Sequence, residues 1–151
     1  MAPRKPFLRT LLQLRADWVE QQVYERAAAN GYPNMTPSLV RLFGHMGGRP
    51  TSTSEIARRM SVSKQAVHQL ANEAVRRGLV ELIPSEHDGR VKLLRFTAQG
   101  WEMSNTAATE LGRIESEIEA CIGAQALEDL RRILALSWPG DGNQVSRTHQ
   151  A

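Results

Sequence analysis

A predicted helix carries four polar side chains on its outward side, Gln65, Gln69, Asn72 and Arg76, with His68 flanking that side and Lys64 in the first turn. The amide of glutamine can form paired hydrogen bonds with adenine, lysine can reach guanine or a phosphate, and histidine can donate to a base acceptor. The alternative is a polar face that is merely solvated and has no specific function, as on most surface helices. The residue types therefore indicate a surface suited to the base edges of DNA, provided that this helix stands out from its domain.

The surrounding residues predict two short helices joined by a tight turn. Ser52 and Glu55 are spaced as in a capping box at the start of the first helix, and the small Ala57 would let the second helix approach closely. Ser63 is the expected N-cap of the second helix, and Gly78 its C-terminal stop. At 100° per residue the buried side of that helix holds Val67, Leu70, Ala71 and Ala74. The polar side chains then face outward.

Two short runs after these helices, 80–84 and 92–96, predict a β-hairpin whose turn is marked by Asp88-Gly89. Arg90 at the tip could enter a narrow minor groove, where A·T-rich DNA concentrates negative potential. The alternative is that Arg90 only pairs with Asp88 or Glu86 on the hairpin. Together the elements predict a helix-turn-helix followed by a wing, a unit that places one helix in the major groove.

Apolar residues at helical spacing predict four further helices, over 7–30, 36–46, 97–121 and 124–137. Residues 49–51 are expected to form a very short strand. The helix that starts at Thr97 carries a near-heptad seam: Met103, Ala107, Leu111, Ile114, Ile118 and Cys121. The last helix is expected to turn five side chains toward a core: Leu127, Leu130, Ile133, Leu134 and Leu136.

The expected fold is mostly α, with a small β-hairpin wing and flanking dimerisation helices. We expect N-terminal helices over 1–48, a winged helix-turn-helix over 49–97, C-terminal dimerisation helices over 98–138 and a disordered tail over 139–151. The flanking helices carry more apolar surface than a unit of about fifty residues can bury, so a homodimer is expected. The alternative is a monomer whose terminal helices pack on each other.

Composition and charge narrow the class of protein. The chain has 151 residues, 41% of them hydrophobic, and a formal net charge of +3. Residues 49–100 hold nine Lys/Arg and five Asp/Glu, whereas 101–138 hold three and seven, so the predicted winged unit is the basic part. No apolar run approaches the roughly 18 residues that span a bilayer, and the basic amino end lacks the pattern of a secretory signal. With a single cysteine, Cys121, these features predict a cytoplasmic protein without disulfides and without membrane association.

Catalytic and metal-binding patterns are missing from the sequence. It has no phosphate-binding glycine loop and no supported nucleophile–histidine pair. The four histidines show no ligand-like spacing with one another or with Cys121: His45, His68, His87 and His149. We therefore expect neither an enzyme nor a cofactor or metal. Cys121 occupies a seam position and is expected to be a buried structural thiol.

The ordered motifs resemble the MarR family of winged-helix transcription regulators over roughly residues 7–137. The matching segments are Glu55-Ile56-Ala57 with Met60, Val62 to Val67, Arg77-Gly78-Leu79-Val80, Asp88-x-Arg90, and Phe96-Thr97-x-x-Gly100. The family's base-reading region corresponds here to Ser63, Lys64, Gln65, His68 and Gln69. Its wing arginine corresponds to Arg90, which Asp88 would orient. Where many relatives carry Thr-Arg after the position of Val67, this chain has His68-Gln69, which affects the target sequence rather than the binding.

The resemblance implies a homodimer on a pseudo-palindromic operator in double-stranded DNA, with recognition helices about 34 Å apart. It further implies a repressor that an effector releases, small aromatic or phenolic acids being frequent effectors in the family. Five side chains are candidates for such a pocket, with ordinary core positions as the alternative for each: Trp18, Tyr24, Met46, Trp101 and Met103. The remaining rival is a winged helix that binds DNA without sequence preference or mediates protein contacts.

Overall fold

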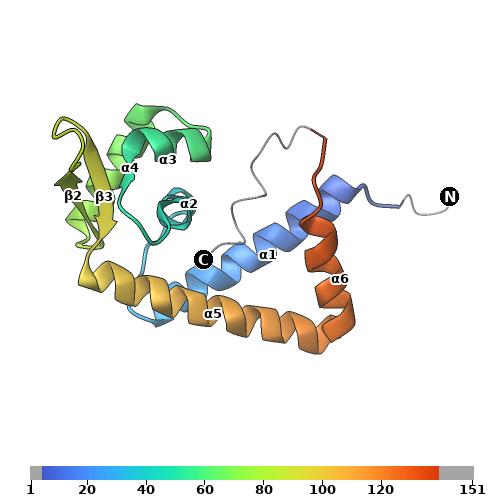
Figure 1. The fold of residues 1–151 in the computed structure, drawn as a ribbon. Helices are drawn as coiled ribbons and strands as arrows, with labels where there is room; N and C mark the ends of the chain where they lie inside the picture. Colours follow the sequence, from blue (N-terminus) through green and yellow to red (C-terminus); the bar gives the residue numbers. More distant parts are fainter. Residues whose placement is uncertain (1–4, 140–151) are drawn as a thin grey trace. The chain divides into compact units, whose positions relative to one another are not determined.

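The computed structural model describes residues 5–139, and the chain divides into two compact units, 1–111 and 112–151. The first unit contains α1 (Leu8–Ala29), α2 (Pro37–Met46), β1 (Thr51–Ser52), α3 (Thr53–Met60), α4 (Lys64–Arg76), β2 (Val80–Pro84), β3 (Lys92–Phe96) and the first half of α5 (Ala98–Ile122) (Figure 1). The second unit contains the rest of α5 and then α6 (Ala124–Leu134). The expected fold class, mostly helical with a small wing, is confirmed.

The sheet is antiparallel with strand order β1-β3-β2. In the hairpin Val80 pairs with Phe96 and Pro84 with Lys92, at the bounds predicted from the sequence. The short strand was expected over residues 49–51 but comprises Thr51 and Ser52. Pro50 has no N–H to contribute to a strand ladder, so pairing with β3 begins only at Thr51, opposite Leu94.

The core of the first unit lies among α2, α3, α4 and the sheet. Its fully buried side chains include Leu39 and Leu42 from α2, Ile56 from α3, Val67 from α4 and Leu94 from β3. As predicted, α4 also buries Ala71 and Ala74, while Leu70 is half-buried. The inward face of α4 is thus fixed by close packing, which fixes its outward face as well.

Side-chain caps define where the helices of this unit begin. The hydroxyl oxygens of Thr36, Ser52 and Ser63 accept hydrogen bonds from the backbone N–H three residues further on, at 3.3, 3.2 and 3.1 Å. The caps at Ser52 and Ser63 were predicted from the sequence. Half of the expected capping box forms, since the Glu55 carboxylate pairs with Arg58 and Arg59 on its own helix. Local sequence therefore fixes the starts of α2, α3 and α4.

The Thr97-x-x-Gly100 motif locks the start of α5 onto the end of α4. The Thr97 hydroxyl donates to the Gly78 carbonyl at 2.6 Å and accepts from the Gly100 N–H at 3.0 Å. A Cβ on Gly100 would lie 1.9 Å from the Leu79 carbonyl oxygen. Only glycine permits this approach, so the motif has a structural role.

The flanking helices depart most from expectation. No residue of α1 is buried, and four of its apolar side chains are 40% or more exposed: Leu8, Leu11, Leu14 and Trp18. Helix α6 ends at Leu134 rather than at residue 137, shortly before Pro139, which disfavours helix in the residue that precedes it. Of the five side chains expected in a core only Leu127 is buried; those exposed are Leu130, Ile133, Leu134 and Leu136.

Cys121 near the end of α5 is exposed, so the prediction of a buried thiol is wrong for the single chain. One physical reason covers Cys121 and the terminal helices alike. Their stripes have helical spacing, which predicts an apolar face but does not supply the surface that would cover it. The tail predicted over 139–151 lies outside the described residues except for Pro139.

Candidate nucleic-acid interface

The outward face of α4 presents the side chains that the sequence singled out. Lys64, Gln65, His68 and Gln69 are all exposed, and Asn72 and Arg76 continue the same face toward the end of the helix. On the opposite face Val67 is fully buried. Ser63, also exposed, is partly engaged because its hydroxyl caps the helix at the Ala66 N–H. The face thus combines hydrogen-bond donors and acceptors with positive charge, and Val75, which is 38% exposed, lies beside it.

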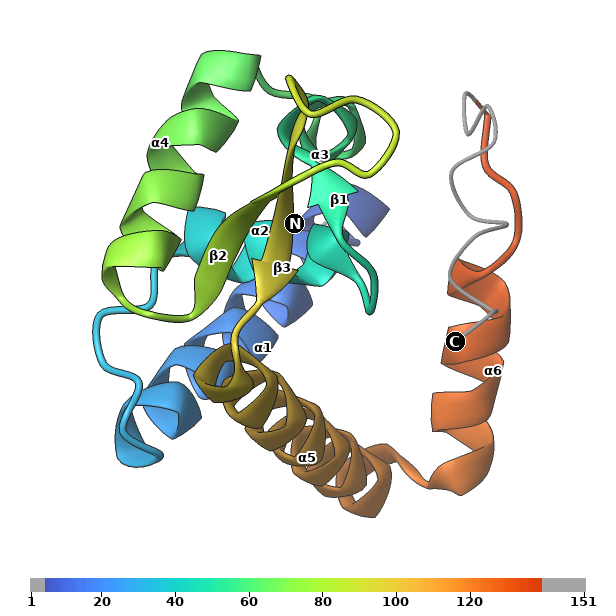
Figure 2. The same cartoon turned by 60° about the vertical axis from the view of Figure 1, so that its left-hand side comes forward.

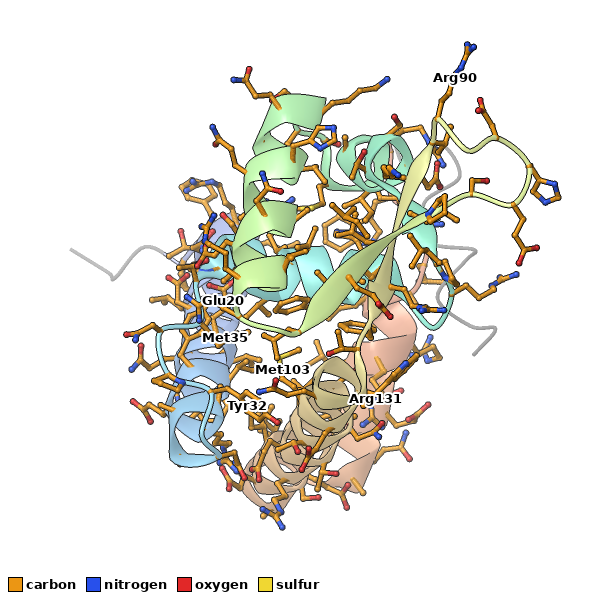
Figure 3. The ribbon with its side chains drawn as sticks, turned by 90° about the vertical axis from the view of Figure 1, so that its left-hand side faces the viewer. Glu20, Tyr32, Met35, Arg90, Met103 and Arg131 are labelled. Atoms are coloured by element: carbon orange, nitrogen blue, oxygen red, sulfur yellow. The ribbon has the colours of Figure 1, made fainter. Side chains whose placement is uncertain are left out.

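The hairpin tip is held by Asp88 in a way that the sequence did not specify. The Asp88 carboxylate accepts from the backbone N–H of Arg90 at 3.0 Å, and its carbonyl accepts from the Val91 N–H at 2.9 Å. Asp88 therefore fixes the backbone on which Arg90 stands rather than holding its guanidinium. The Arg90 side chain projects from the tip into open space (Figure 3). Within residues 5–139 no ion pair joins Arg90 to Asp88 or Glu86.

The two elements present their functional groups at one end of the unit. Figure 2 shows the N-terminal end of α4 and the tip of the hairpin at the same end. A tight turn sets this arrangement: Ser61 ends α3 in the left-handed conformation with φ 55°, and the Val62 N–H donates to the Ala57 carbonyl at 3.1 Å. The polar face of α4 and Arg90 can therefore meet one extended partner together.

Two arginines brace the helix-turn-helix against α2. Arg41 donates to the Met60 carbonyl at 3.0 Å, and Arg59 donates to the His45 carbonyl at 2.9 Å. Partial burial, together with the charges of Arg41 and Arg59, lowers the pKa of His45. Hydrogen bonds from Arg58 and Arg59 lower the pKa of Glu55. These contacts orient α3 without using any side chain of the outward face of α4.

Comparison with known proteins agrees with this geometry. Residues 34–91, which span α2 to the hairpin tip, match the model of the MarR family. Over this stretch the chain is similar to the MarR family. A comparison with curated protein sequences found no significant match.

Solved structures extend the likeness beyond the winged unit. Wild-type MarR from E. coli is 17% identical with a TM-score of 0.70, covering 87% of this chain and 96% of that one. The YusO protein from Bacillus subtilis is 20% identical with a TM-score of 0.64, covering 85% and 89%. A mutant of MepR from S. aureus, solved bound to an oligodeoxyribonucleotide, is 14% identical with a TM-score of 0.57, covering 86% and 94%. The chain therefore has the fold of MarR-family transcriptional regulators.

Away from the wing tip, residues of α1, α2, the loop between them and α5 line an apolar cavity of about 310 Å³. Figure 3 labels three of the residues that line it, Tyr32, Met35 and Met103. Two of the lining residues, Arg26 and Glu110, form an ion pair at 3.3 Å. Apart from that pair and Asn30, the walls offer few polar groups. The cavity thus suits a small, largely apolar molecule.

The sequence anticipated only one residue of this cavity, Met103. Met46 is buried in the core, Trp101 packs on the ring of Phe96 with centroids 5.2 Å apart, and Trp18 is exposed. Tyr24 does not line the cavity. The pKa of its phenol is raised, first by partial burial and then by the nearby negative charge of Glu20. Tyr32 and Met35 were missed because they belong to the loop between α1 and α2, where no periodic pattern indicates which way a side chain points.

Arg77 makes contacts that the sequence analysis did not predict. At the end of α4 its guanidinium donates to the carbonyls of Pro33 and Asn34, at 3.3 and 3.0 Å, and to the Glu73 carboxylate at 2.7 Å. The two carbonyls belong to residues more than forty positions earlier, so no local spacing could reveal the contact.

Two further observations bear on function. Among the residues that the structure describes, no group of three or more His, Cys, Asp or Glu side chains could hold a metal ion. No helix within residues 5–139 is long and apolar enough to cross a membrane.

Proposed function

We propose that this chain is a sequence-specific DNA-binding transcriptional regulator that reads double-stranded DNA with α4 and the wing. One observation carries the proposal: the exposed polar face of α4 begins at the end of the winged unit that also holds the hairpin tip (Figure 2), from which Arg90 projects (Figure 3). The oligodeoxyribonucleotide in the MepR structure supports it, because that protein has the same fold.

Each side chain has a role that follows from its chemistry. Gln65, His68 and Gln69 contact base edges in the major groove, where each base pair presents a distinct set of donors and acceptors. Lys64 reaches guanine or a phosphate, and Ser63 lies at the helix N-terminus, where backbone N–H groups favour phosphate oxygens. Arg90 enters the adjacent minor groove from a tip that Asp88 holds in place.

The regulator is proposed to act as a homodimer on a pseudo-palindromic operator. Exposed apolar side chains support it, on α1 at Leu14 and Trp18 and on α6 at Ile133, since exposed apolar surface commonly marks contacts between proteins. The N-terminal segment 1–48 and the C-terminal segment 98–138 then supply the dimerisation helices. Two-fold symmetry would place the two copies of α4 about one DNA turn, roughly 34 Å, apart.

Repression relieved by a small effector is the proposed mode of action, with the apolar cavity as the effector site. An aromatic ring can pack against Tyr32, Phe43 and Met35. Arg26, a cation on the cavity wall, is paired with Glu110. The carboxylate of a ligand would therefore have to compete with Glu110 for Arg26. A neutral phenol is therefore expected to bind more tightly than the corresponding phenolic acid, which can be measured by calorimetry with phenol and 4-hydroxybenzoate.

Selection of binding sites from random duplex DNA tests the function as a whole. The proposal expects recovery of a short palindrome that resists excess competitor DNA. If no motif is recovered, and if competitor DNA and salt abolish binding, the protein binds DNA without sequence preference. No retention of DNA at low salt would leave only a protein-binding winged helix, and turnover without any DNA shift would point to an enzyme.

A further inference from the structure

The loop between α1 and α2 takes part in two contacts at once. Its side chains Tyr32 and Met35 line the apolar cavity. Between them, Pro33 and Asn34 give their backbone carbonyls to the guanidinium of Arg77. A movement of one part of so short a segment displaces the other.

Arg77 in turn is fastened to the recognition helix. It is the C-cap of α4, and its guanidinium also makes two hydrogen bonds to Glu73, at 2.7 and 3.2 Å, one turn earlier on the same helix. Its side chain is 29% exposed and that of Glu73 32%, so the pair is partly shielded from water. Arginine suits this position because its planar fork of donors can satisfy a carboxylate and two carbonyls together.

The loop conformation itself depends on outside support. Asn34 has φ 61°, a left-handed backbone that side chains other than glycine adopt infrequently, although asparagine tolerates it better than most. Such residues persist when the surrounding contacts hold them. The hydrogen bond from Arg77 to the Asn34 carbonyl is one such contact.

We propose that Arg77 is a positioning residue that couples the apolar cavity to the recognition helix. A molecule in the cavity that presses on Tyr32 or Met35 shifts the carbonyls of Pro33 and Asn34. Arg77 transmits that shift to the end of α4 and so changes how α4 lies in the major groove. This inference rests on the proposed function and gives its effector response a physical route.

The other arginine braces do not offer the same route. Arg41 and Arg59 join α2 to α3 within the helix-turn-helix, and neither carbonyl that they contact belongs to the loop. The route through Arg77 therefore makes a prediction that these braces do not share.

A double-mutant cycle on DNA affinity tests the coupling without an identified ligand. Met35→Ala should change the Kd for the selected DNA site in the wild-type background, and Arg77→Met should abolish most of that change. Val23→Ala is the matched control, because Val23 lines the same cavity from α1 and has no link to Arg77. Coupling free energies between sites commonly correspond to factors of roughly 5 to 150. We expect Met35→Ala and Arg77→Met to deviate from multiplicative effects by at least about fivefold, and Val23→Ala with Arg77→Met by less than about twofold.

Multiplicative effects for both pairs would overturn the proposal, as would a deviation equal for Met35 and Val23. Arg77→Lys provides a second cycle should Arg77→Met fail to fold, since it keeps the charge but loses the fork. Amide hydrogen exchange at Val75 and Arg76 in DNA-free protein is the second readout. If the two substitutions have non-additive effects on hydrogen exchange but the protein does not bind DNA selectively, the coupling is upheld and the proposed function is refuted. If the protein binds DNA selectively but the effects on exchange and on Kd are additive, the proposed function is upheld and the coupling is refuted.

Discussion

The winged unit together with α2 buries most of its large apolar side chains, whereas the terminal helices leave most of theirs exposed. From Leu39 to Phe96 the large apolar side chains of α2, α3, α4 and β3 are mostly buried against one another. No residue of α1 is fully buried, and α6 buries only Leu127. The winged unit is therefore complete within one chain, whereas the terminal helices present surface for a further contact.

This difference means that substitutions affecting the stability of the single chain can be told apart from substitutions affecting its assembly. A substitution in the winged core should act on folding of the single chain, and a substitution on α1 should act through association. The two classes of effect can be distinguished because association depends on protein concentration and a monomer's folding does not.

Leu42→Ala and Leu14→Ala test this separation most strongly. Leu42 is fully buried, so its truncation should lower the free energy of unfolding by about 2–5 kcal/mol at every protein concentration. Leu14 is 58% exposed, and its truncation should have an effect only at concentrations at which the wild type is dimeric. Urea denaturation over a hundredfold range of concentration, with sedimentation to report mass, provides the measurement. A concentration-independent loss at Leu14 would contradict the account.

Gly100→Ala tests the close approach of α5 to Leu79. Because the added Cβ would meet the Leu79 carbonyl, we expect a loss of about 3 kcal/mol in the free energy of unfolding. Gly112→Ala is the matched control on the same helix, where a Cβ meets nothing within 4 Å. There the change should stabilise by about 0.5–1 kcal/mol, because alanine favours helix over glycine. Equal effects at the two positions would show that the approach at Gly100 is unimportant.

Local signals made much of the winged unit predictable. Thr36, Ser52 and Ser63 each cap a helix through a neighbour three residues away, and Asp88-Gly89 marks a turn, so short segments carry the information. The outward face of α4 followed from the period of 3.6 alone. The exposure of Cys121 and Ile133 could not be predicted in this way, since periodicity identifies an apolar stripe but not what covers it. The contacts of Arg77 depend on the tertiary fold.

Arg90→Ala tests the part of the proposed interface that lies at the hairpin tip. If Arg90 enters the minor groove, its loss should weaken binding to the selected site by about 1–3 kcal/mol, with the fold unchanged. Arg95→Ala is a suitable control, because Arg95 is paired with Glu81 on the hairpin at 2.7 Å. Fluorescence anisotropy at several salt concentrations measures both variants. An affinity for Arg90→Ala equal to that of the wild type at every salt concentration would remove the wing from the interface.

His68→Ala and Gln65→Ala should alter which sequence is preferred rather than whether DNA binds. Each good base contact discriminates by about 1–3 kcal/mol, and phosphate contacts supply most of the remaining affinity. Site selection repeated with each variant should relax one or two positions of the recovered motif. A motif that is unchanged for both variants would mean that the reading residues lie elsewhere on α4.

The smallest effect concerns His45 and the brace between α2 and α3. Partial burial and the nearby Arg41 and Arg59 lower the pKa of His45 in the folded chain. The unfolded chain then binds the proton more readily, so this contribution to stability is present above pH 6.5 and is lost as the pH falls through the folded pKa. His45→Gln should reduce the pH dependence of the melting temperature between about pH 7.5 and 5. His87→Gln, on the exposed hairpin loop, should leave that dependence in place.

Hydroxyl-radical footprinting of the selected duplex tests the central claim most directly. The account predicts two protected patches related by two-fold symmetry, with centres about one helical turn apart, and loss of the minor-groove protection in Arg90→Ala. A single patch, or protection spread evenly along the duplex, would contradict it.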